Sequence, residues 1–453
     1  MSLVRSVSGT GRGFESPART QILTLWHIFE TPKQLSITDM KRLFAVGLFL
    51  IFSNLSGQDF KLIENCTSSI RTINPTDTSF SDLEFLVPIL ESKRIVLLGE
   101  QEHGDGAAFE AKIRLIKFLN KKLGFKIVAF ETPFYSTLTT WDKFVKDQAN
   151  IEEVEKSLVY KHWANSVEMQ PLFEIAKTKE IQLAGIDLPF LRKIEKEQYV
   201  KSVDSITRNS RIPNNPMFKS ILVDLLTKGI TFIPEVNDQK IFLNQINTTL
   251  SELAERSDYQ AIFWRQEFKN LLALGTGWWQ KDAHTRKNWW SSGNIRDKQM
   301  ADNIAWLTTE KYKNQKIIVW AANYHIARNV SSEVMRDKYF ENTKAAAMGD
   351  YLSELMNDNI YSIGLVSYKG VRSVPEDNFR NIEMKPRTKG SIESFLNTNG
   401  FDYSFVNFQS CGIESKFKMA GFFHDELVGN WTRVFDGILF IKQMTPITLR
   451  VQK

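Results

Sequence analysis

The sequence predicts an α/β fold with a mainly parallel sheet flanked by helices and a large helical insertion lobe. Short β-branched runs alternate with amphipathic helical patterns, which is typical of strands joined by crossover helices. Between about residues 189 and 290 the strand pattern fades and helical periodicity dominates. We therefore expect the lobe in this interval.

The first strand, helix and second strand are predicted at 94–98, 109–123 and 125–130. Both strands are continuous apolar runs, and the helix repeats apolar residues at helical spacing. Ahead of them, Ser81 is expected to cap a helix that runs to about Glu91. The pattern recurs in further helix and strand pairs, at 172–178 and 182–186, 297–310 and 316–321, and 351–356 and 360–365.

The composition is that of a globular protein. The 453 residues are 42% hydrophobic and 24% charged, with a net charge of +6. Because Lys and Arg are scattered among Asp and Glu, no nucleic-acid partner is predicted. Cys66 and Cys411 lie in neither a CxxC nor a Cys/His spacing, which excludes zinc-ribbon and redox motifs and leaves a disulfide open.

The N-terminal region contains a signal-peptide pattern at residues 40–57. Two cations precede an apolar run at 43–52, and small or polar residues follow it. This run is shorter than the roughly 20 apolar residues that span a bilayer, so an exported, periplasmic or secreted protein without a stable membrane span is expected. Residues 1–39 are interpreted as a misannotated or disordered extension, with translation starting at Met40.

Ionisable and strongly polar residues follow several of the predicted strands. They are Glu100 and His103 after the first strand, Glu131 after the second, Asp187 after a third, and Asn323 with His325 after a later one. Ligands of such sheets bind outside the carboxyl ends of the strands. We therefore expect these side chains to gather at one edge of the sheet.

Two chemistries fit this set of residues. Histidines beside carboxylates favour general acid and base catalysis, because a carboxylate fixes the tautomer of the imidazole. Two His and one or two Glu could also hold zinc, and their spacing leaves both readings open. A GxSxG elbow, a Walker motif and a dinucleotide motif are absent from the sequence, so water activated by a base is the simplest reaction.

Four tryptophans mark the end of the predicted lobe, at positions 278, 279, 289 and 290. Paired tryptophans usually pack in a core. Their Gly-flanked and partly polar surroundings fit the wall of a cleft for a bulky apolar ligand nearly as well. Both interpretations remain open at this level.

Several ordered motifs resemble the erythromycin esterase family. They are LLGEQEHG at 97–104, FE at 130–131, NIRDKQMADNIAWL at 294–307, WAANYHIARN at 320–329, GDYL at 349–352 and a closing strand at 435–441. The likeness covers about Leu83 to Ile441, and residues 58–453 are accordingly interpreted as one domain. It implies an α/β core, a helical lobe, a deep cleft, and metal-independent hydrolysis of a macrolide lactone without a cofactor.

The resemblance also implies a role for each matching catalytic residue. His103 would be the general base that takes a proton from water, and Glu131 would orient His103 or hold its charged form. Glu100 would position the loop or the water. His325 and Arg296 would steady the substrate or the oxyanion that develops on the lactone carbonyl.

Substrate binding is assigned to Lys112, Arg296, Asn323 and Asp187. Lys112 stands where macrolide-inactivating members are expected to carry arginine, and lysine lacks the planar fork of a guanidinium. The resulting hypothesis is a hydrolase of carboxylic esters or lactones, with macrolides as candidate substrates. The alternative is an exported protein of the same fold that binds haem, a metal or an apolar ligand.

Overall fold

The computed structural model describes residues 57–190, 193–208, 215–280, 289–334 and 345–450. The expected extension at 1–39 lies outside these residues, as does all but the last position of the expected signal peptide. The described chain forms one compact unit.

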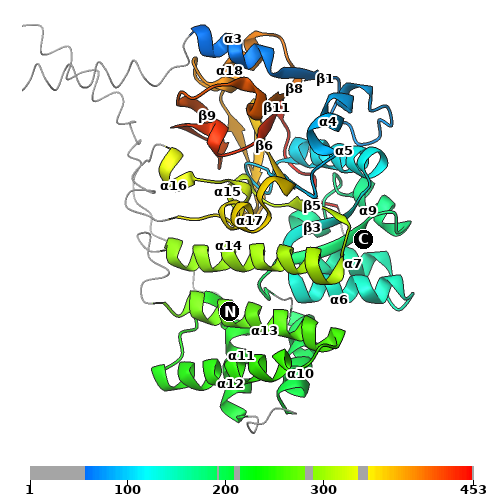
Figure 1. Ribbon diagram of the computed structural model, residues 1–453, viewed down its shortest axis with the longest axis vertical. Helices are drawn as coiled ribbons and strands as arrows, with labels where there is room; N and C mark the ends of the chain where they lie inside the picture. Colours follow the sequence, from blue (N-terminus) through cyan, green and yellow to red (C-terminus); the bar gives the residue numbers. More distant parts are fainter. Residues whose placement is uncertain (1–56, 191–192, 209–214, 281–288, 335–344, 451–453) are drawn as a thin grey trace, which may run out of the picture. The chain divides into compact units, whose positions relative to one another are not determined.

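At the centre of the described chain is a nine-stranded sheet with the order β1-β8-β11-β6-β2-β5-β3-β4, and β7 pairs with β6 (Figure 1). Its strands are β1 Thr67–Ile70, β2 Ile95–Leu98, β3 Phe125–Pro133, β4 Gln182–Asp187, β5 Lys316–Trp320, β6 Ile360–Val374, β7 Arg380–Met384, β8 Tyr403–Asn407 and β11 Gly437–Met444. The pairings from β11 across to β4 are parallel, whereas β1, β8 and β7 pair antiparallel. The predicted fold class is confirmed.

Helices cover both faces of the sheet, because its central strands are apolar on both sides. In β2, Ile95 and Leu97 belong to one apolar cluster, whereas Val96 and Leu98 belong to the other. The helices outside the lobe are α3 Gly57–Asn65, α4 Val87–Leu90, α5 Gly106–Leu123, α6 Phe134–Val145, α7 Ile151–Ser157, α8 Lys161–Ala164, α9 Gln170–Lys177, α14 Trp289–Trp306, α15 Asn323–Ile326, α16 Val330–Glu333, α17 Met348–Met356, α18 Ile392–Thr398 and α19 Phe408–Cys411.

Local sequence explains where two of these helices begin and end. Gly124 ends α5 in the left-handed conformation, with φ of 73°, and its N–H donates back into the last turn. The helix expected from Ser81 differs from the prediction, since residues 81–86 form a 3₁₀ helix without a side-chain cap before α4 begins. Pro88 has no N–H to donate to the carbonyl four residues back, which favours the tighter turn before it.

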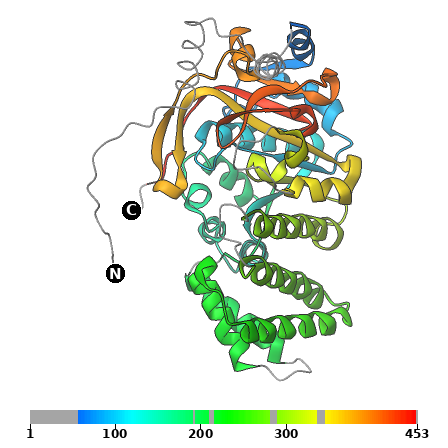
Figure 2. The same cartoon turned by 90° about the vertical axis from the view of Figure 1, so that its left-hand side faces the viewer.

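In the described part of the interval expected from the sequence, four α-helices form the lobe. They are α10 Lys193–Arg208, α11 Pro216–Lys228, α12 Val236–Ala254 and α13 Tyr259–Trp278. Each packs against the next, and α13 packs against α14. Because α14 also packs against β4 and α17, it joins the lobe to the sheet (Figures 1 and 2).

Two further strands form a separate hairpin, β9 Phe417–Phe422 with β10 Asp425–Gly429.

In the described part of the chain, no helix is both long and apolar enough to cross a membrane.

Candidate active site

The polar residues predicted at strand ends do meet at one edge of the sheet. Glu100 follows β2, Glu131 lies near the end of β3, Asp187 ends β4, and His325 lies in α15 directly after β5. Because β2, β5, β3 and β4 are neighbours in that order, their carboxyl ends bring the four side chains to one place.

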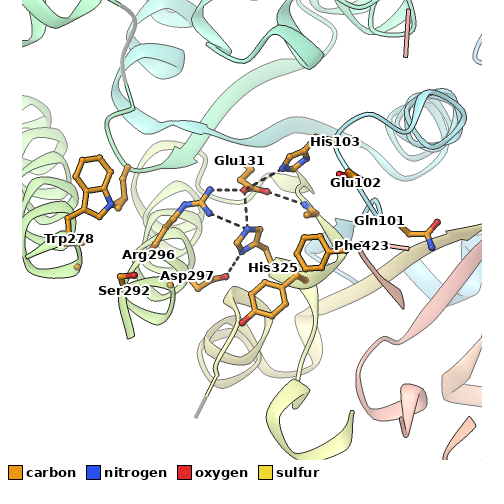
Figure 3. A pocket seen from close by; sticks show the side chains of 16 residues that line it. Gln101, Glu102, His103, Glu131, Trp278, Ser292, Arg296, Asp297, His325 and Phe423 are labelled. Carbon is orange, nitrogen blue, oxygen red and sulfur yellow. Dashed lines mark hydrogen bonds and ion pairs between the residues drawn. The ribbon is translucent and has the colours of Figure 1, made fainter. Parts of the chain in front are cut away.

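Glu131 is the centre of the resulting cluster (Figure 3). Its Oε1 accepts a hydrogen bond of 2.7 Å from Arg296 and lies 3.1 Å from Nε2 of His325. Its Oε2 accepts a hydrogen bond from the backbone N–H of Ala322 at 3.2 Å. Burial favours the neutral acid, but the positive charges of His325 and Arg296 outweigh burial and hold the pKa of Glu131 well below its usual value. Glu131 is therefore ionised.

His325 is held between two carboxylates. Its Nδ1 lies 2.7 Å from Oδ1 of Asp297, and its Nε2 faces Glu131. The Oδ1 of Asp297 also accepts the backbone N–H of Met348 at 2.8 Å, which fixes the carboxylate. Burial alone would lower the pKa of His325, but Asp297 and Glu131 raise it to about 10. At neutral pH, His325 is an imidazolium ion that donates from both nitrogens.

Arg296 connects the cluster to the end of β4. Its guanidinium group donates to both carboxylate oxygens of Asp187 at 2.5 to 3.1 Å and to Glu131. Although burial opposes the charged form, the two carboxylates raise the pKa of Arg296 well above its usual value. Its side chain keeps 26% exposure, so a fixed positive charge remains accessible beside Glu131.

His103 has a different environment from His325. Its Nδ1 lies 2.8 Å from Oε1 of the fully buried Glu100. Its Nε2 is 4.0 Å from the carboxylate of Glu131, which is beyond hydrogen-bond distance, and 21% of the side chain is exposed. The ring of His103 stacks on His162, with centroids 4.9 Å apart and planes 8° apart. Nε2 of His103 is therefore without a hydrogen-bond partner among the described residues.

Lys112 supports His103 indirectly, through the buried carboxylate of Glu100. Its ammonium group forms an ion pair with the second carboxylate oxygen of Glu100 and donates to the carbonyl oxygen of Ala321 at 3.2 Å. The ammonium also lies 4.7 Å from the centre of the Trp320 ring. Lys112 and Glu100 are both fully buried, and burial holds the pKa of Lys112 well below its usual value. The contact between the two side chains orients the carboxylate that binds His103.

Two adjoining cavities meet at this cluster. The first has a volume of about 610 Å³ and the second a volume of about 860 Å³. His103, Glu131, Arg296 and Trp278 line both of them. Because the candidate catalytic groups lie where the cavities join, a single ligand could extend into each cavity from a reacting atom at the cluster.

Three of the four predicted substrate-binding residues lie behind the cavity walls. Lys112, Asp187 and Asn323 are fully buried and line neither cavity. The side-chain amide of Asn323 donates to the carbonyl oxygens of Leu365 and Gly421, and its oxygen accepts the N–H of Leu365. The structure therefore gives these three residues supporting positions, and only Arg296 of the four reaches the cavities.

Sequence reasoning assigned no role to Asp297 or His162, although both lie within the cluster. Asp297 stands next to Arg296 in the NIRDKQMADNIAWL motif, which is the signal that could have identified it. His162 lies in α8 with 6% exposure, and its Nε2 has no hydrogen-bond partner among the described residues. Burial, followed by the nearby His103, lowers the pKa of His162 well below its usual value, so this imidazole is neutral.

The tryptophans divide between the two interpretations drawn from the sequence. Trp278 lines both cavities and lies 5.5 Å from Phe190 between ring centroids. Trp279 is buried and packs edge-on against Phe242, with centroids 5.1 Å apart. Trp290 is buried next to Tyr324. One tryptophan therefore belongs to the cleft wall and two to the packed interior, and the side chain of Trp289 lies outside the described part of the structure.

The sequence left open a zinc site formed by two His and one or two Glu, and the geometry of the described residues bears on it. Among the described residues, no group of three or more His, Cys, Asp and Glu side chains is arranged to hold a metal ion.

Comparison with known proteins identifies a family. The erythromycin esterase family profile matches residues 121–443, which is more than two thirds of the chain. The Bacillus subtilis protein named "Putative hydrolase YbfO" is 25% identical over 421 residues, covering 83% of this chain and 89% of its own. Erythromycin esterase type II of Escherichia coli is 23% identical over 408 residues, covering 82% and 94%.

The fold is also found among solved structures. A mutant of the erythromycin esterase EreC in its open conformation superposes with a TM-score of 0.60 at 15% identity. The match covers 85% of this chain and all of EreC. At this level of identity the likeness concerns the fold.

Proposed function

Because the chain belongs to the erythromycin esterase family, we propose that it hydrolyses carboxylic esters or lactones with a water molecule activated by His103. Family membership supports a hydrolase. The observation that carries the finer proposal is the imidazole of His103, whose Nδ1 is bound to a buried carboxylate while the residue lines both cavities.

The first step follows from the hydrogen bond between His103 and Glu100. The carboxylate of Glu100 accepts the Nδ1 proton of His103, which leaves a lone pair on Nε2. Nε2 takes a proton from water while the water oxygen attacks the ester carbonyl. The ionised Glu131, 4.0 Å from Nε2, stabilises the imidazolium that forms.

Collapse of the tetrahedral intermediate completes the reaction. The carbonyl reforms, the bond to the alcohol oxygen breaks, and the imidazolium of His103 returns its proton to that oxygen. The negative charge on the former carbonyl oxygen requires a fixed cation until then. We assign this role to Arg296, because it lines both cavities and its Nη1 donates to no carboxylate among the described residues, whereas both nitrogens of His325 face carboxylates.

The size of the cavities supports a bulky substrate. A ligand that occupied both cavities would fill more space than a simple short-chain ester. A macrolide lactone is the first candidate, because an esterase of that name is among the relatives. The alternative of a haem-, metal- or ligand-binding protein is not favoured by the family.

The experiment that tests the function is incubation of purified protein with a macrolide and, separately, with simple esters. Mass spectrometry would detect a ring-opened macrolide heavier by one water molecule, or the separate acid and alcohol released from a simple ester, and His103→Asn is the matched control. Turnover of simple esters without turnover of macrolides would remove the macrolide proposal. No hydrolysis of any ester or lactone would contradict the function itself.

We also propose that the protein is exported. The signal-peptide pattern at 40–57 supports this, and so does the disulfide between Cys66 and Cys411, whose Cα atoms are 5.2 Å apart. N-terminal sequencing of the native protein tests the proposal. A mature chain beginning near residue 58 agrees with it, and a chain that retains Met1 contradicts it.

A further inference from the structure

Two hairpin turns outside the catalytic cluster have an unusual backbone. The turn between β6 and β7 contains Asn378 and Phe379, with φ of 51° and 59°, and the turn between β9 and β10 contains Phe423 and His424, with φ of 50° and 62°. A bulky residue rarely adopts this left-handed region, which Gly and Asn enter readily. Each hairpin therefore holds a phenylalanine where a smaller residue would fit the turn better.

Each phenylalanine lines a different cavity. Phe423 lines the cavity of about 610 Å³ and keeps 48% exposure, which is high for a large apolar side chain (Figure 3). Phe379 lines the cavity of about 860 Å³. Strained residues are concentrated at functional sites, and the turns themselves do not require an aromatic ring. The position of the rings at the cavities is therefore the feature to be explained.

Both hairpins are fastened to the loop that carries His103. Nε2 of His424 lies 3.0 Å from Oδ1 of Asp105, whose Oδ2 accepts the backbone N–H of Glu102 at 3.1 Å. In β6, Arg372 forms an ion pair with the side chain of Glu102. Because Glu102 is adjacent to His103, these bonds hold the two hairpins in a fixed relation to the catalytic imidazole.

The β9–β10 turn has a second anchor. Arg387 donates to the backbone carbonyl of His424 at 2.8 Å, and its Nη2 lies 3.1 Å from Nδ1 of the same residue. His424 is thus bound on both ring nitrogens and only 7% exposed, whereas its neighbour Phe423 projects to the cavity. The turn buries one residue as an anchor and exposes the other.

We infer that Phe423 and Phe379 are specificity-determining residues that contact opposite sides of the scissile ester. This inference rests on the proposed function. The two cavities meet at His103, so groups attached to the acyl carbon and to the alcohol oxygen extend into different cavities and reach different phenylalanines. The preferred substrate class is an ester or lactone with a bulky apolar group on each side of the carboxyl group.

The test compares four esters: methyl acetate, phenyl acetate, methyl benzoate and phenyl benzoate. They carry a ring on neither side, on the alcohol side, on the acyl side and on both sides. Wild-type protein is compared with Phe423→Asn and Phe379→Asn, because asparagine removes the ring and tolerates the left-handed turn.

The control is Leu355→Ala, which removes a large apolar side chain from α17. The exposure of Leu355, 51%, is similar to that of Phe423. Taking kcat/KM of each variant relative to wild type removes the intrinsic reactivity of each ester.

One variant is expected to lower kcat/KM for phenyl acetate and the other for methyl benzoate, each by roughly 10-fold, and both variants to lower it for phenyl benzoate. Leu355→Ala should leave all four values within about twofold, like any surface change away from the cavities. If both asparagine variants act on the same ester, or on all four alike, the specificity assignment is wrong although hydrolysis stands. If wild-type protein opens a macrolide lactone but hydrolyses none of the four esters, the specificity assignment falls and the proposed function stands. If it hydrolyses neither a macrolide nor any of the four, the proposed function is contradicted and this inference falls with it. Where an asparagine variant does not fold, the glycine variant of the same position is measured instead.

Discussion

The two histidines of the site share one motif but differ at the second nitrogen. Nδ1 of each faces a carboxylate, Glu100 at 2.8 Å for His103 and Asp297 at 2.7 Å for His325. Nε2 of His325 lies 3.1 Å from Glu131, whereas Nε2 of His103 is 4.0 Å away. The difference teaches that two close carboxylates, Asp297 and Glu131, hold His325 as a cation, whereas Nε2 of His103 has no hydrogen-bond partner among the described residues and is the nitrogen that can act on substrate.

The largest expected effect is at the histidine with the available nitrogen. His103→Asn removes the base, so kcat should fall roughly 10²- to 10⁴-fold. The thermal transition should be nearly unchanged, because the side chain is partly exposed and its partner Glu100 keeps its ion pair with Lys112. Kinetics with whichever ester the wild-type protein turns over, together with a melting curve, measure both quantities. Wild-type turnover in this variant would give His103 a structural role.

The next effect concerns the support beneath His103. Lys112→Met leaves the buried carboxylate of Glu100 without its cation and should lower the free energy of unfolding by about 3–5 kcal/mol. Urea unfolding measures the loss. Lys122→Met on the same helix is the control, because Lys122 pairs with Glu84 at the surface, where a pair contributes about 0–1 kcal/mol. Equal effects of the two substitutions would contradict a supporting role for Lys112.

The locked histidine should be visible in the pH dependence of stability. The folded pKa of about 10 exceeds the ordinary value of 6.5, so the stabilisation from protonated His325 is complete below about pH 6.5 and disappears as the pH rises through about 10. The free energy of unfolding should fall by up to about 1.4 kcal/mol per pH unit in this window. His325→Asn should flatten that slope, and parallel profiles for variant and wild type would refute the charge assignment.

The smallest expected effect is at the neighbour that stacks on His103. His162→Phe keeps a buried ring but removes a nitrogen that has no partner among the described residues. The free energy of unfolding should stay equal or rise by about 1 kcal/mol, since an unsatisfied buried polar atom is lost. Chemical denaturation tests this expectation. A marked loss of stability would mean that Nε2 of His162 has a partner, such as an ordered water.

The sequence predicted the strand ends well, because strand periodicity and the topology of parallel sheets fix where Glu131 and His325 lie. Burial of long side chains was harder to predict. Lys112 lies on a helix with apolar neighbours, and nothing in its spacing shows whether its ammonium group reaches a cavity or a buried carboxylate. Asn323 was likewise assigned to substrate, although its amide bonds to backbone atoms that are distant in sequence.

Tertiary partners explain the residues that sequence reasoning left without a role. Asp297 acts on His325 only because α14 crosses the strand ends, and the sequence gives no distance between them. His162 follows no strand, so the criterion that selected His103 and His325 could not select it. No sequence pattern drew attention to Phe379 and Phe423, the two phenylalanines of the hairpin turns. What sets them apart is their left-handed backbone conformation, which only the structure shows.

The central claim, that carboxylates occupy both nitrogens of His325 but only Nδ1 of His103, can be tested by ¹⁵N NMR of histidine-labelled protein. His103→Asn and His325→Asn assign the signals. At pH 8 we expect both nitrogens of His325 to be protonated, because Asp297 and Glu131 raise its pKa to about 10, and we expect the neutral tautomer of His103 to be the one with its proton on Nδ1, where Glu100 accepts it. A neutral His325, or a His103 protonated on Nε2, would contradict the account.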